Sequence, residues 1–487
     1  MNNQSFDHII IGAGFAGICM GIKLKQAGLN NFVILERNSH LGGTWWDNSY
    51  PGATCDVESH LYSYSFEPNP NWSRQFSPQE EILNYLEQCA AKYGMNEHLL
   101  LNSTVANATF NEAHGLWTVN TTTGKTYTAQ IVVSCSGGLS QPSIPDIKGL
   151  KNYKGKLFHS ARWDKNFDLK DKKVAVIGTG ASSIQIVPAI APVVKQLDVF
   201  QRTPAWIIPK PDKPISAFRR AMYNKLPFMR KLYRSRLYWT HEMMALGFTG
   251  GTGIMKVFSK VALMFIKKSI SDETLRKKVT PNYVPGCKRI LLSNDYYPAL
   301  QLKNVAVITE GIKEINETGL MTVDGKQYNA DAIIMATGFK AAEGVIAFDI
   351  KGKNGIDLND VWRYGAEAYL GISISGFPNL FLVVGPNTGL GHSSMILMIE
   401  AQVNYIMDCI GLMKKDKLKF VDVKKTTEVE YNREIQEKLS KSVWQTGGCH
   451  SWYQDKNGKN VSLWPGFTFT FMKRTKKFEP EKYELVK

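Results

Sequence analysis

Residues 6–36, with the sequence FDHIIIGAGFAGICMGIKLKQAGLNNFVILE, decide how the chain begins to fold. The apolar run at residues 6–11 predicts a buried strand, and an apolar helix follows it. The turn between them contains three glycines, Gly12, Gly14 and Gly17. In this setting the first glycine makes a tight turn, the second lets the backbone approach a pyrophosphate, and the third lets helix pack on strand. A second strand ends at Glu36, whose carboxylate can accept hydrogen bonds from a ribose, so the stretch predicts a dinucleotide-binding domain.

The same pattern returns at residues 173–202, KVAVIGTGASSIQIVPAIAPVVKQLDVFQR. A strand at 173–177 again leads through a short turn into an apolar helix. The turn and the start of the helix supply the residues expected to contact a second cofactor: Gly178, Thr179, Gly180, Ser182 and Ser183. Ser183 takes the place of the third glycine, which predicts slightly looser packing of helix on strand.

The residue after the second strand of each unit distinguishes the two cofactors. Counted from the first glycine of its unit, Arg202 occupies the position that Glu36 occupies in the first unit. A carboxylate suits a free ribose 2′-hydroxyl, whereas a guanidinium suits a 2′-phosphate. We therefore expect FAD in the first unit and NADPH in the second. The alternative is that Arg202 is an ordinary surface residue after a strand.

Buried strands at 128–136 and 330–335 predict the joins between these units. The first runs into Gly137 and Gly138 and a proline-containing exit, and the second runs into the turn ATGF at 336–339. The predicted fold is α/β, with two Rossmann-like domains, the second inserted in the first, and a basic helical insertion. The expected divisions are an FAD-binding domain at 1–148 and 336–487, an NADPH-binding domain at 149–208 and 281–335, and the helical insertion at 209–280.

The net charge of +16 is concentrated in one segment. Residues 213–278 contain 15 Lys and Arg but 3 Asp and Glu. The simplest interpretation is a solvated helical insertion with a basic outer face. A second interpretation is weak peripheral attraction to an anionic membrane, because the apolar run 261–266 precedes Lys267 and Lys268. Nucleic-acid binding is not expected, because the rest of the chain carries little excess positive charge.

Seven cysteines are scattered without a CxxC pair or a metal-type cluster. This distribution predicts reduced thiols, no metal site and a cytoplasmic protein. The N-terminus enters a strand at once, without the pattern of a signal peptide. The most apolar long segment, residues 395–413, is interrupted by Glu400 and Asp408 and is expected to be a core helix.

Two further stretches resemble the sequence fingerprints of Baeyer–Villiger monooxygenases. Residues 42–56, GGTWWDNSYPGATCD, match the [A/G]GxWxxxx[F/Y]P[G/M]xxxD fingerprint of that family. Residues 153–164, YKGKLFHSARWD, match FxGxxxHxxxW[P/D] at Gly155, His159 and Trp163, with Tyr153 in place of the opening Phe. The resemblance continues through 286–289, the ATGF turn, 385–387 and 451–453, and so covers most of the chain.

This resemblance implies a reaction. NADPH reduces FAD, O2 adds at the flavin C4a carbon, and the peroxide inserts one oxygen next to a ketone carbonyl to give an ester or lactone. Arg289 matches the family's active-site arginine, a cation suited to stabilising the peroxy anion, and Asp56 matches its partner. Taken singly, Arg289 is compatible with a surface ion pair and Asp56 with a turn residue.

The resemblance also assigns residues around the two cofactors. Lys288 and Thr203 match residues that help to bind the NADPH phosphate. Trp452 matches an aromatic residue that closes over the nicotinamide nucleotide, although an ordinary core position is equally compatible. His159, on the linker between domains, is expected to act as a hinge or hydrogen-bonding residue. The remaining residues expected around FAD are Glu36 and Arg37 on the adenosine side and Thr44, Trp45 and Tyr62 near the flavin.

Three alternatives remain at this point. A flavin-containing monooxygenase acting on nitrogen or sulfur would use the same cofactors, and sulfoxidation of a thioether is expected as a side activity. A disulfide reductase would need a redox cysteine pair near the flavin, but no CxxC or CxxxxC follows Cys19. A non-catalytic flavoprotein would use the basic insertion for docking. The particular ketone does not follow from the sequence.

Overall fold

Strand β1 (Gln4–Ile11) lies inside the first sheet, with a neighbouring strand on each side. Its apolar residues are buried on both faces of the sheet. Ile10 packs with the helix side of the sheet, whereas Ile9 and Ile11 pack with the opposite side. β1 pairs in parallel with β2 (Phe32–Leu35) and with β6 (Thr126–Ser134). The computed structural model describes residues 4–250, 252–342 and 346–487.

The first sheet has the order β17-β4-β5-β6-β1-β2-β3, and β18 pairs with the end of β6. Its other strands are β3 (Leu99–Leu100), β4 (Val105–Asn111), β5 (Leu116–Thr121), β17 (Asp349–Lys351) and β18 (Leu380–Leu382). Helix α1 (Phe15–Gln26) packs against α11 (Met395–Asp416) on one face. α11 is long and apolar enough to cross a membrane by composition, but most of it is buried in this core, as the interrupted apolar pattern predicts.

The second sheet is entirely parallel, with the order β12-β9-β8-β16-β7. Its strands are β7 (Lys156–His159), β8 (Lys173–Ile177), β9 (Gln196–Phe200), β12 (Val305–Ile308) and β16 (Ala332–Met335). Helices α4 (Ser183–Ile190) and α9 (Tyr296–Ala299) cover one face. The other face packs on an antiparallel meander of β13 (Ile312–Asn316), β14 (Gly319–Thr322) and β15 (Gln327–Asn329).

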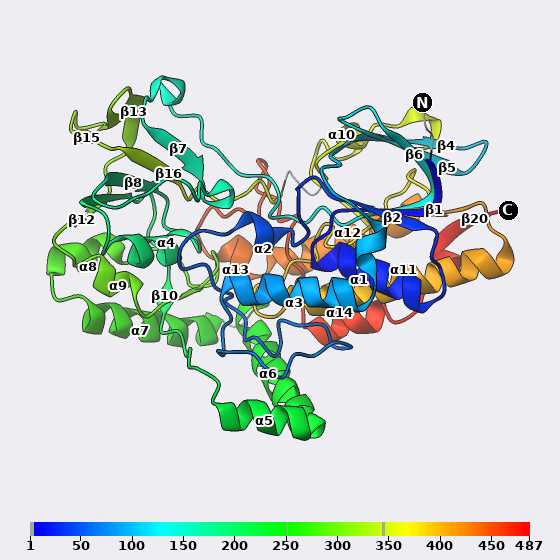
Figure 1. The fold of residues 1–487 in the computed structure, drawn as a ribbon, viewed down its shortest axis with the longest axis horizontal. Helices are drawn as coiled ribbons and strands as arrows, with labels where there is room; N and C mark the ends of the chain where they lie inside the picture. The colour runs from blue at the N-terminus through cyan, green and yellow to red at the C-terminus, as the bar shows by residue number, and fades with distance from the viewer. Residues whose placement is uncertain (1–3, 251, 343–345) are drawn as a thin grey trace.

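The helical insertion leaves the second domain after β10 (Ile207–Ile208) and returns to it at β11 (Leu291–Leu292). It consists of α5 (Ala217–Lys225), α6 (Pro227–Phe248), α7 (Thr252–Ser269) and α8 (Glu273–Val279). Figure 1 shows the two sheets as separate lobes, with α5 and the start of α6 projecting below them. Because strands of the first sheet precede and follow those of the second, the predicted fold of one Rossmann-like domain inserted in another is confirmed.

The remaining elements connect and cover these lobes. The other helices are α2 (Thr44–Asp47), α3 (Gln79–Lys92), α10 (Leu358–Val361), α12 (Lys425–Ser440), α13 (Val443–Thr446) and α14 (Thr468–Arg474). Short 3-10 turns occur at Met95–His98, Leu150–Asn152, Ser160–Arg162, Lys353–Gly355 and Pro480–Lys482. A C-terminal pair, β19 (Phe420–Val423) and β20 (Tyr483–Val486), is antiparallel.

The glycines of the first turn are required for two different reasons. A Cβ on Gly17 would lie 1.8 Å from the carbonyl oxygen of Gly12, so the third glycine lets α1 start against β1. A Cβ on Gly14 would lie 3.6 Å from Cα of Gly43, which is an ordinary contact. Gly14 is therefore needed for room beside the backbone, where a pyrophosphate would lie, and not for the fold.

Replacing these two glycines by alanine should separate folding from cofactor binding. We expect Gly17→Ala to destabilise the protein by about 1–3 kcal/mol through overpacking, with loss of bound flavin. Gly14→Ala should lose flavin but melt like the flavin-free wild type, because its backbone packing is unchanged. Thermal unfolding and the flavin content of the purified variants measure both effects. A Gly17→Ala protein that melts like the wild type would contradict the packing argument.

Candidate active site

An ion pair between Arg289 and Asp56 lies where the two domains meet. Nε of Arg289 donates to Oδ2 of Asp56 at 2.7 Å. The side chains keep 27% and 31% of their exposure, so both can be reached by a ligand. Asp56 ends the first fingerprint and Arg289 precedes β11, and 233 residues separate them. The structure thus brings together the two residues that the sequence resemblance pairs.

The charges of this pair reinforce each other. Burial alone would raise the pKa of Asp56, but the charge and hydrogen bond of Arg289 and the charge of Lys210 hold it below its usual range. Asp56 in turn raises the pKa of Arg289 despite burial. Lys210 is fixed nearby by a 2.8 Å hydrogen bond from Nζ to Oγ1 of Thr54. Both members of the pair are therefore ionised, with Arg289 as a permanent cation.

Tyr453 lies beside the arginine, and the sequence resemblance assigned no role to it but only to its neighbour Trp452, as a contact to the nicotinamide nucleotide. Tyr453 is buried, whereas Trp452 is substantially exposed, and the two rings pack at a centroid distance of 4.5 Å. Burial raises the pKa of the Tyr453 phenol, and the charge of Arg289 opposes that rise. The exposed position of Trp452 is compatible with contact to a nucleotide, so its predicted role stays a prediction.

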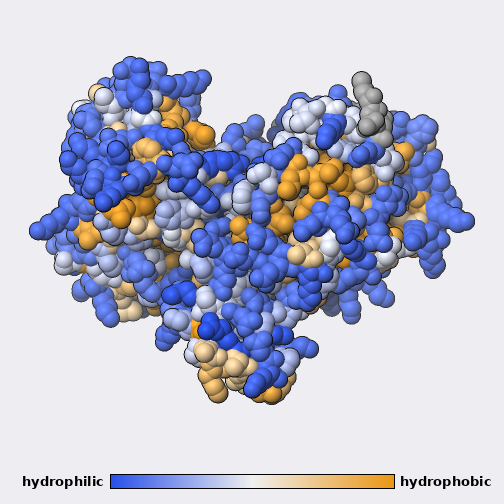
Figure 2. Space-filling view, viewed as in Figure 1, coloured by the Kyte–Doolittle hydropathy of each residue, from blue (hydrophilic) through white to orange (hydrophobic). Residues whose placement is uncertain are grey.

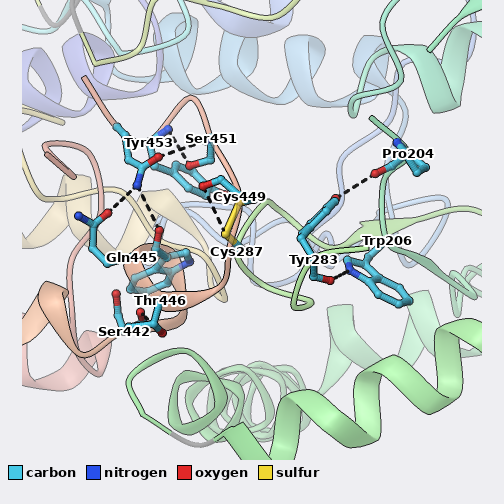
Figure 3. The surroundings of a disulfide bond; sticks show 12 residues. Pro204, Trp206, Tyr283, Cys287, Ser442, Gln445, Thr446, Cys449, Ser451 and Tyr453 are labelled. Carbon is cyan, nitrogen blue, oxygen red and sulfur yellow. Dashed lines mark hydrogen bonds between the residues drawn. A yellow bond between two sulfur atoms is a disulfide. The ribbon is translucent and has the colours of Figure 1, made fainter. Parts of the chain in front are cut away.

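A disulfide joins Cys287 to Cys449, with a Cα–Cα distance of 6.1 Å across 162 residues of sequence. The expectation that all seven cysteines are isolated reduced thiols is therefore wrong for this pair. The reason is that residue spacing says nothing about which distant loops pack together. The remaining five cysteines are free and buried. Figure 3 shows that the bond ties the loop before Arg289 to the segment that carries Ser451 and Tyr453.

Cations converge at the end of β9 in the second domain. Burial, and then the nearby charge of Arg202, lowers the pKa of Lys288. Thr203, which follows Arg202, is tied to the glycine turn of this domain. Oγ1 of Thr179 in that turn donates to the carbonyl of Thr203 at 2.9 Å. At the start of α4, the buried hydroxyl of Ser183 has no partner among the described residues. Two cations held close together favour an anion between them, and the residues present fit a 2′-phosphate.

The flavin side of the site is a backbone cradle. A Cβ on Gly43 would lie 3.0 Å from Cα of Gly14, so the two glycine turns face each other with no side chain between them. Glu36 is buried, and its two carboxylate oxygens accept the backbone amides of Ala13 and Asn38 at 2.7 and 2.9 Å. Each oxygen retains a lone pair for a ribose hydroxyl, so the cradle fits the ADP part of FAD.

The aromatic and basic residues predicted near FAD also lie beside this cradle. Trp45 lies in the short helix α2, which begins at Thr44. Its Nε1 donates to the hydroxyl of Tyr62 at 3.0 Å. Arg37 is held by Asp47 at 2.6 Å. These contacts fix the side chains before any cofactor binds, because each polar group already has a partner.

The first fingerprint also joins the domains. Gln185 of α4 accepts from the hydroxyl of Tyr50 at 3.0 Å and donates to the carbonyl of Thr54 at 2.9 Å. A Cβ on Gly52, which has φ +82°, would lie 2.7 Å from the carbonyl oxygen of Gln185. The conformation and the close approach both require glycine at this position of the fingerprint.

The second fingerprint holds the linker between domains. His159 is buried: its Nδ1 accepts from the amide of Ala161 at 3.1 Å, and Nε2 lies 3.0 Å from the carbonyl of Gly338 in the ATGF turn. Burial lowers the pKa of the His159 ring, so it stays neutral with its proton on Nε2. Trp163 packs edge-on against Phe158, and Gly155 has no room for a Cβ beside Tyr153. His159 therefore makes the hydrogen bonds expected of a linker residue, and its hinge role stays a prediction.

Glu58 and His241 form a second charged pair that the sequence did not reveal. Nε2 of His241 lies 2.6 Å from Oε2 of Glu58, and Nδ1 lies 2.5 Å from the carbonyl of His392. Both ring nitrogens face acceptors, which requires two N–H groups. Burial would lower the pKa of His241, but Glu58 raises it overall. Glu58 follows Asp56 by two positions, which is the one available signal, whereas nothing in the local pattern around His241 indicates this contact.

Comparisons with known proteins agree with this geometry. The family model of pyridine nucleotide-disulphide oxidoreductases matches residues 9–218. A Baeyer–Villiger monooxygenase of Pseudomonas aeruginosa is 48% identical over 98% of this chain and 91% of its own length. One of Streptomyces coelicolor is 44% identical over 100% of this chain and 94% of its own. The crystal structure of OTEMO in complex with FAD and NADP superposes with a TM-score of 0.89 at 27% identity, covering 99% of each chain. Cyclohexanone monooxygenase of Rhodococcus sp. Phi1 bound to NADP+ gives a TM-score of 0.89 at 27% identity over 100% of each chain.

The fold and the site define a flavin-dependent monooxygenase with two dinucleotide-binding domains. The fingerprint residues lie at the junction of those domains, and the relatives match nearly the whole chain. The chain belongs to the Baeyer–Villiger monooxygenase family. The disulfide-reductase alternative is thereby removed, although the pyridine nucleotide-disulphide oxidoreductase model matches residues 9–218, which include the first strand–glycine–helix units of both domains.

Removing either cation of the phosphate site should weaken NADPH selectively. We expect Arg202→Ala and Lys288→Ala each to raise KM for NADPH by about 10- to 100-fold, the loss of one charged hydrogen bond, with little change for NADH. Steady-state kinetics with both nucleotides measures this. Lys277→Ala, an exposed cation paired with Glu273, serves as the matched control. Equal losses with NADPH and NADH would show that neither residue contacts the 2′-phosphate.

Opening the disulfide should loosen the loop that carries Lys288 and Arg289. Titration of the unfolded protein should find five free thiols before reduction and seven after. We expect Cys449→Ser to cost about 2–4 kcal/mol of stability and to raise KM for NADPH. Reductant should reproduce both effects in the wild type and add nothing to the variant. Seven free thiols in the unreduced protein would contradict the pairing.

Proposed function

We propose that this chain uses FAD and NADPH to insert one oxygen atom of O2 next to the carbonyl of a small-molecule ketone, giving an ester or lactone. The observation that carries the proposal is the Arg289–Asp56 ion pair, exposed to a ligand at the junction of the two domains. When bound, FAD reduced by NADPH supplies the activation of O2. The related OTEMO structure is a complex with FAD and NADP, which supports the same cofactors here.

The chain's own residues would prepare the site for that chemistry. Arg289 would place a permanent positive charge where negative charge develops on the reacting oxygen and on the carbonyl oxygen. Asp56 binds Nε of the guanidinium, which orients the group and leaves its terminal nitrogens for substrate or cofactor. Tyr453 is buried beside the arginine, whose charge acts on its phenol.

Each cofactor is assigned by the polar groups that face it. Glu36 and the facing backbones of Gly14 and Gly43 would hold the ADP part of FAD. Arg202 and Lys288 would bind the 2′-phosphate of NADPH. His159, bonded to the carbonyl of Gly338, would couple the linker to the first domain when the nucleotide changes position.

A thioether would be a secondary substrate. Oxygen transfer to sulfur favours a neutral, protonated oxidant, whereas a fixed cation such as Arg289 favours an anionic one that attacks carbonyls. Sulfoxidation is accordingly proposed as a side activity and not as the main reaction. We also propose a cytoplasmic location: five of the seven cysteines are free, which supports it, whereas the Cys287–Cys449 disulfide is of a kind rare in that compartment.

Arg289→Ala should separate the two half-reactions. We expect reduction of FAD by NADPH to continue within a few-fold of the wild-type rate, while ester formation falls by about 10²- to 10³-fold through loss of the stabilising charge. Arg289→Lys should retain part of the activity because it keeps the charge without the orienting Nε contact. Stopped-flow flavin absorbance and product analysis under labelled O2 measure the two steps. Ester formation by Arg289→Ala near the wild-type rate would refute the role.

The substrate can be approached with a screen. NADPH oxidation, corrected for uncoupled turnover, should rise with one group among linear, cyclic and aryl ketones and less with a thioether. Mass spectrometry of the product should show one oxygen from O2. NADPH oxidation that yields only sulfoxide would favour the nitrogen- and sulfur-oxygenating alternative.

A further inference from the structure

The outer face of α6 is apolar and uncovered. Phe228, Leu232, Trp239 and Met243 are each more than half exposed. Their spacing places them on one stripe of the helix, because residues three, four or seven positions apart share a face. Figure 2 shows apolar surface at the lower tip of the molecule, where Figure 1 places α5 and the start of α6.

Neighbouring elements extend this stripe at both ends. On α5 and the bend that follows, Phe218 is 78% exposed and Leu226 is exposed as well. At the other end, Phe469 of α14 packs against Trp239 with ring centroids 6.2 Å apart, and it is itself partly exposed. The apolar surface therefore spans α5, the full length of α6 and the start of α14. Contiguous apolar surface of this kind on a single chain marks an interaction site.

The charges around the stripe have one sign. No Asp or Glu occurs in residues 213–241. The basic residues of the same segment are Lys213, Arg219, Arg220, Lys225, Arg230, Lys231, Arg234 and Arg236. Lys231 and Arg236 are exposed on either side of the stripe, whereas the first acid that follows, Glu242, is buried and accepts the amide of Thr468. The surface thus combines exposed aromatic and aliphatic side chains with cations and no exposed carboxylate from this segment.

The predicted apolar run at 261–266 takes a smaller part. Ala262 and Ile266 on α7 are buried, whereas Val261, Leu263 and Met264 are exposed beside Lys267 and Lys268. The basic segment therefore presents exposed apolar residues on α7 as well as on α5 and α6, and its largest exposed aromatic side chains, Phe218, Phe228 and Trp239, belong to α5 and α6.

The inner face of α6 contacts the loop that follows Asp56. Nη1 of Arg234 donates to the carbonyl of His60 at 2.5 Å and to Oγ of Ser63 at 3.2 Å, and His241 pairs with Glu58. These residues follow Asp56 directly in sequence. One helix therefore separates the exposed apolar surface from the loop that carries the reactive ion pair.

We propose that the α5–α6 surface docks in the headgroup region of an anionic lipid bilayer. A helix with Phe, Trp and Leu on one face and Lys and Arg beside them lies in the plane of such an interface, held by apolar burial and by attraction to anionic headgroups. The surface has both components. Resting on the proposed function, docking brings the active-site loop close to ketones that partition into the membrane, so the substrate class is a lipophilic ketone.

Flotation of the intact holoenzyme with lipid vesicles tests the docking. We expect binding to vesicles of phosphatidylcholine mixed with phosphatidylglycerol, weaker binding to phosphatidylcholine alone, and partial release at about 1 M salt, where screening is short-ranged. Phe228→Ser/Leu232→Ser and Lys231→Gln/Arg236→Gln should each lower the vesicle partition coefficient at least about tenfold. Val323→Ser, at an equally exposed apolar residue in the β14–β15 turn, is the matched control and should bind like the wild type.

Activity on a water-soluble ketone should be unchanged in all three variants, because none of the altered residues lies in the site. Activity on a long-chain ketone embedded in anionic vesicles should fall in the two surface variants only. Wild-type-like flotation of those variants, or equal binding to neutral and anionic vesicles, would overturn the proposal. The proposal would also fail if the wild type did not float with vesicles but formed a dimer in solution that the Phe228→Ser/Leu232→Ser variant does not form. The surface would then bind a second copy of the chain. Loss of ketone oxidation with intact flotation would refute the proposed reaction and leave the docking standing.

Discussion

The ion pair between Arg289 and Asp56 is the contact on which the arrangement of the molecule depends. An arginine in a partly buried site is stabilised by a neighbouring carboxylate, because an unpaired cation there is costly. The carboxylate comes from the first domain and the guanidinium from the second, so the pair forms only when both domains are docked. Fold, inter-domain contact and chemistry therefore meet at one hydrogen bond.

Other links hold the two domains in that relation without belonging to the reaction. Gln185 bonds the first fingerprint to α4, and the Cys287–Cys449 bond ties the arginine loop to the C-terminal segment. His159 connects the linker to the ATGF turn through a neutral ring. Hydrogen bonds can break and re-form, whereas the disulfide holds its two loops together covalently.

Helix α6 gives the basic insertion a physical role. Its inner face is bound to the loop after Asp56 through Arg234 and His241, and its outer face carries the apolar stripe. The proposed docking would account for the concentration of the excess cations in residues 213–278. A surface that attracts anionic headgroups needs positive charge locally, whereas the nucleotide-binding domains need only a few fixed cations.

The sequence by itself determined the two strand–glycine–helix units, their nesting and the assignment of Glu36 and Arg202, because these depend on short spacing and on the chemistry of single residues. The family fingerprints also paired Asp56 with Arg289. Only the tertiary structure decided which distant groups meet: Tyr453 beside the arginine, Lys210 beside Asp56, and the disulfide that the scattered cysteines did not indicate. Periodicity shows that a helix has an apolar face, but only the packing of the remaining chain decides whether that face is covered or left to solvent.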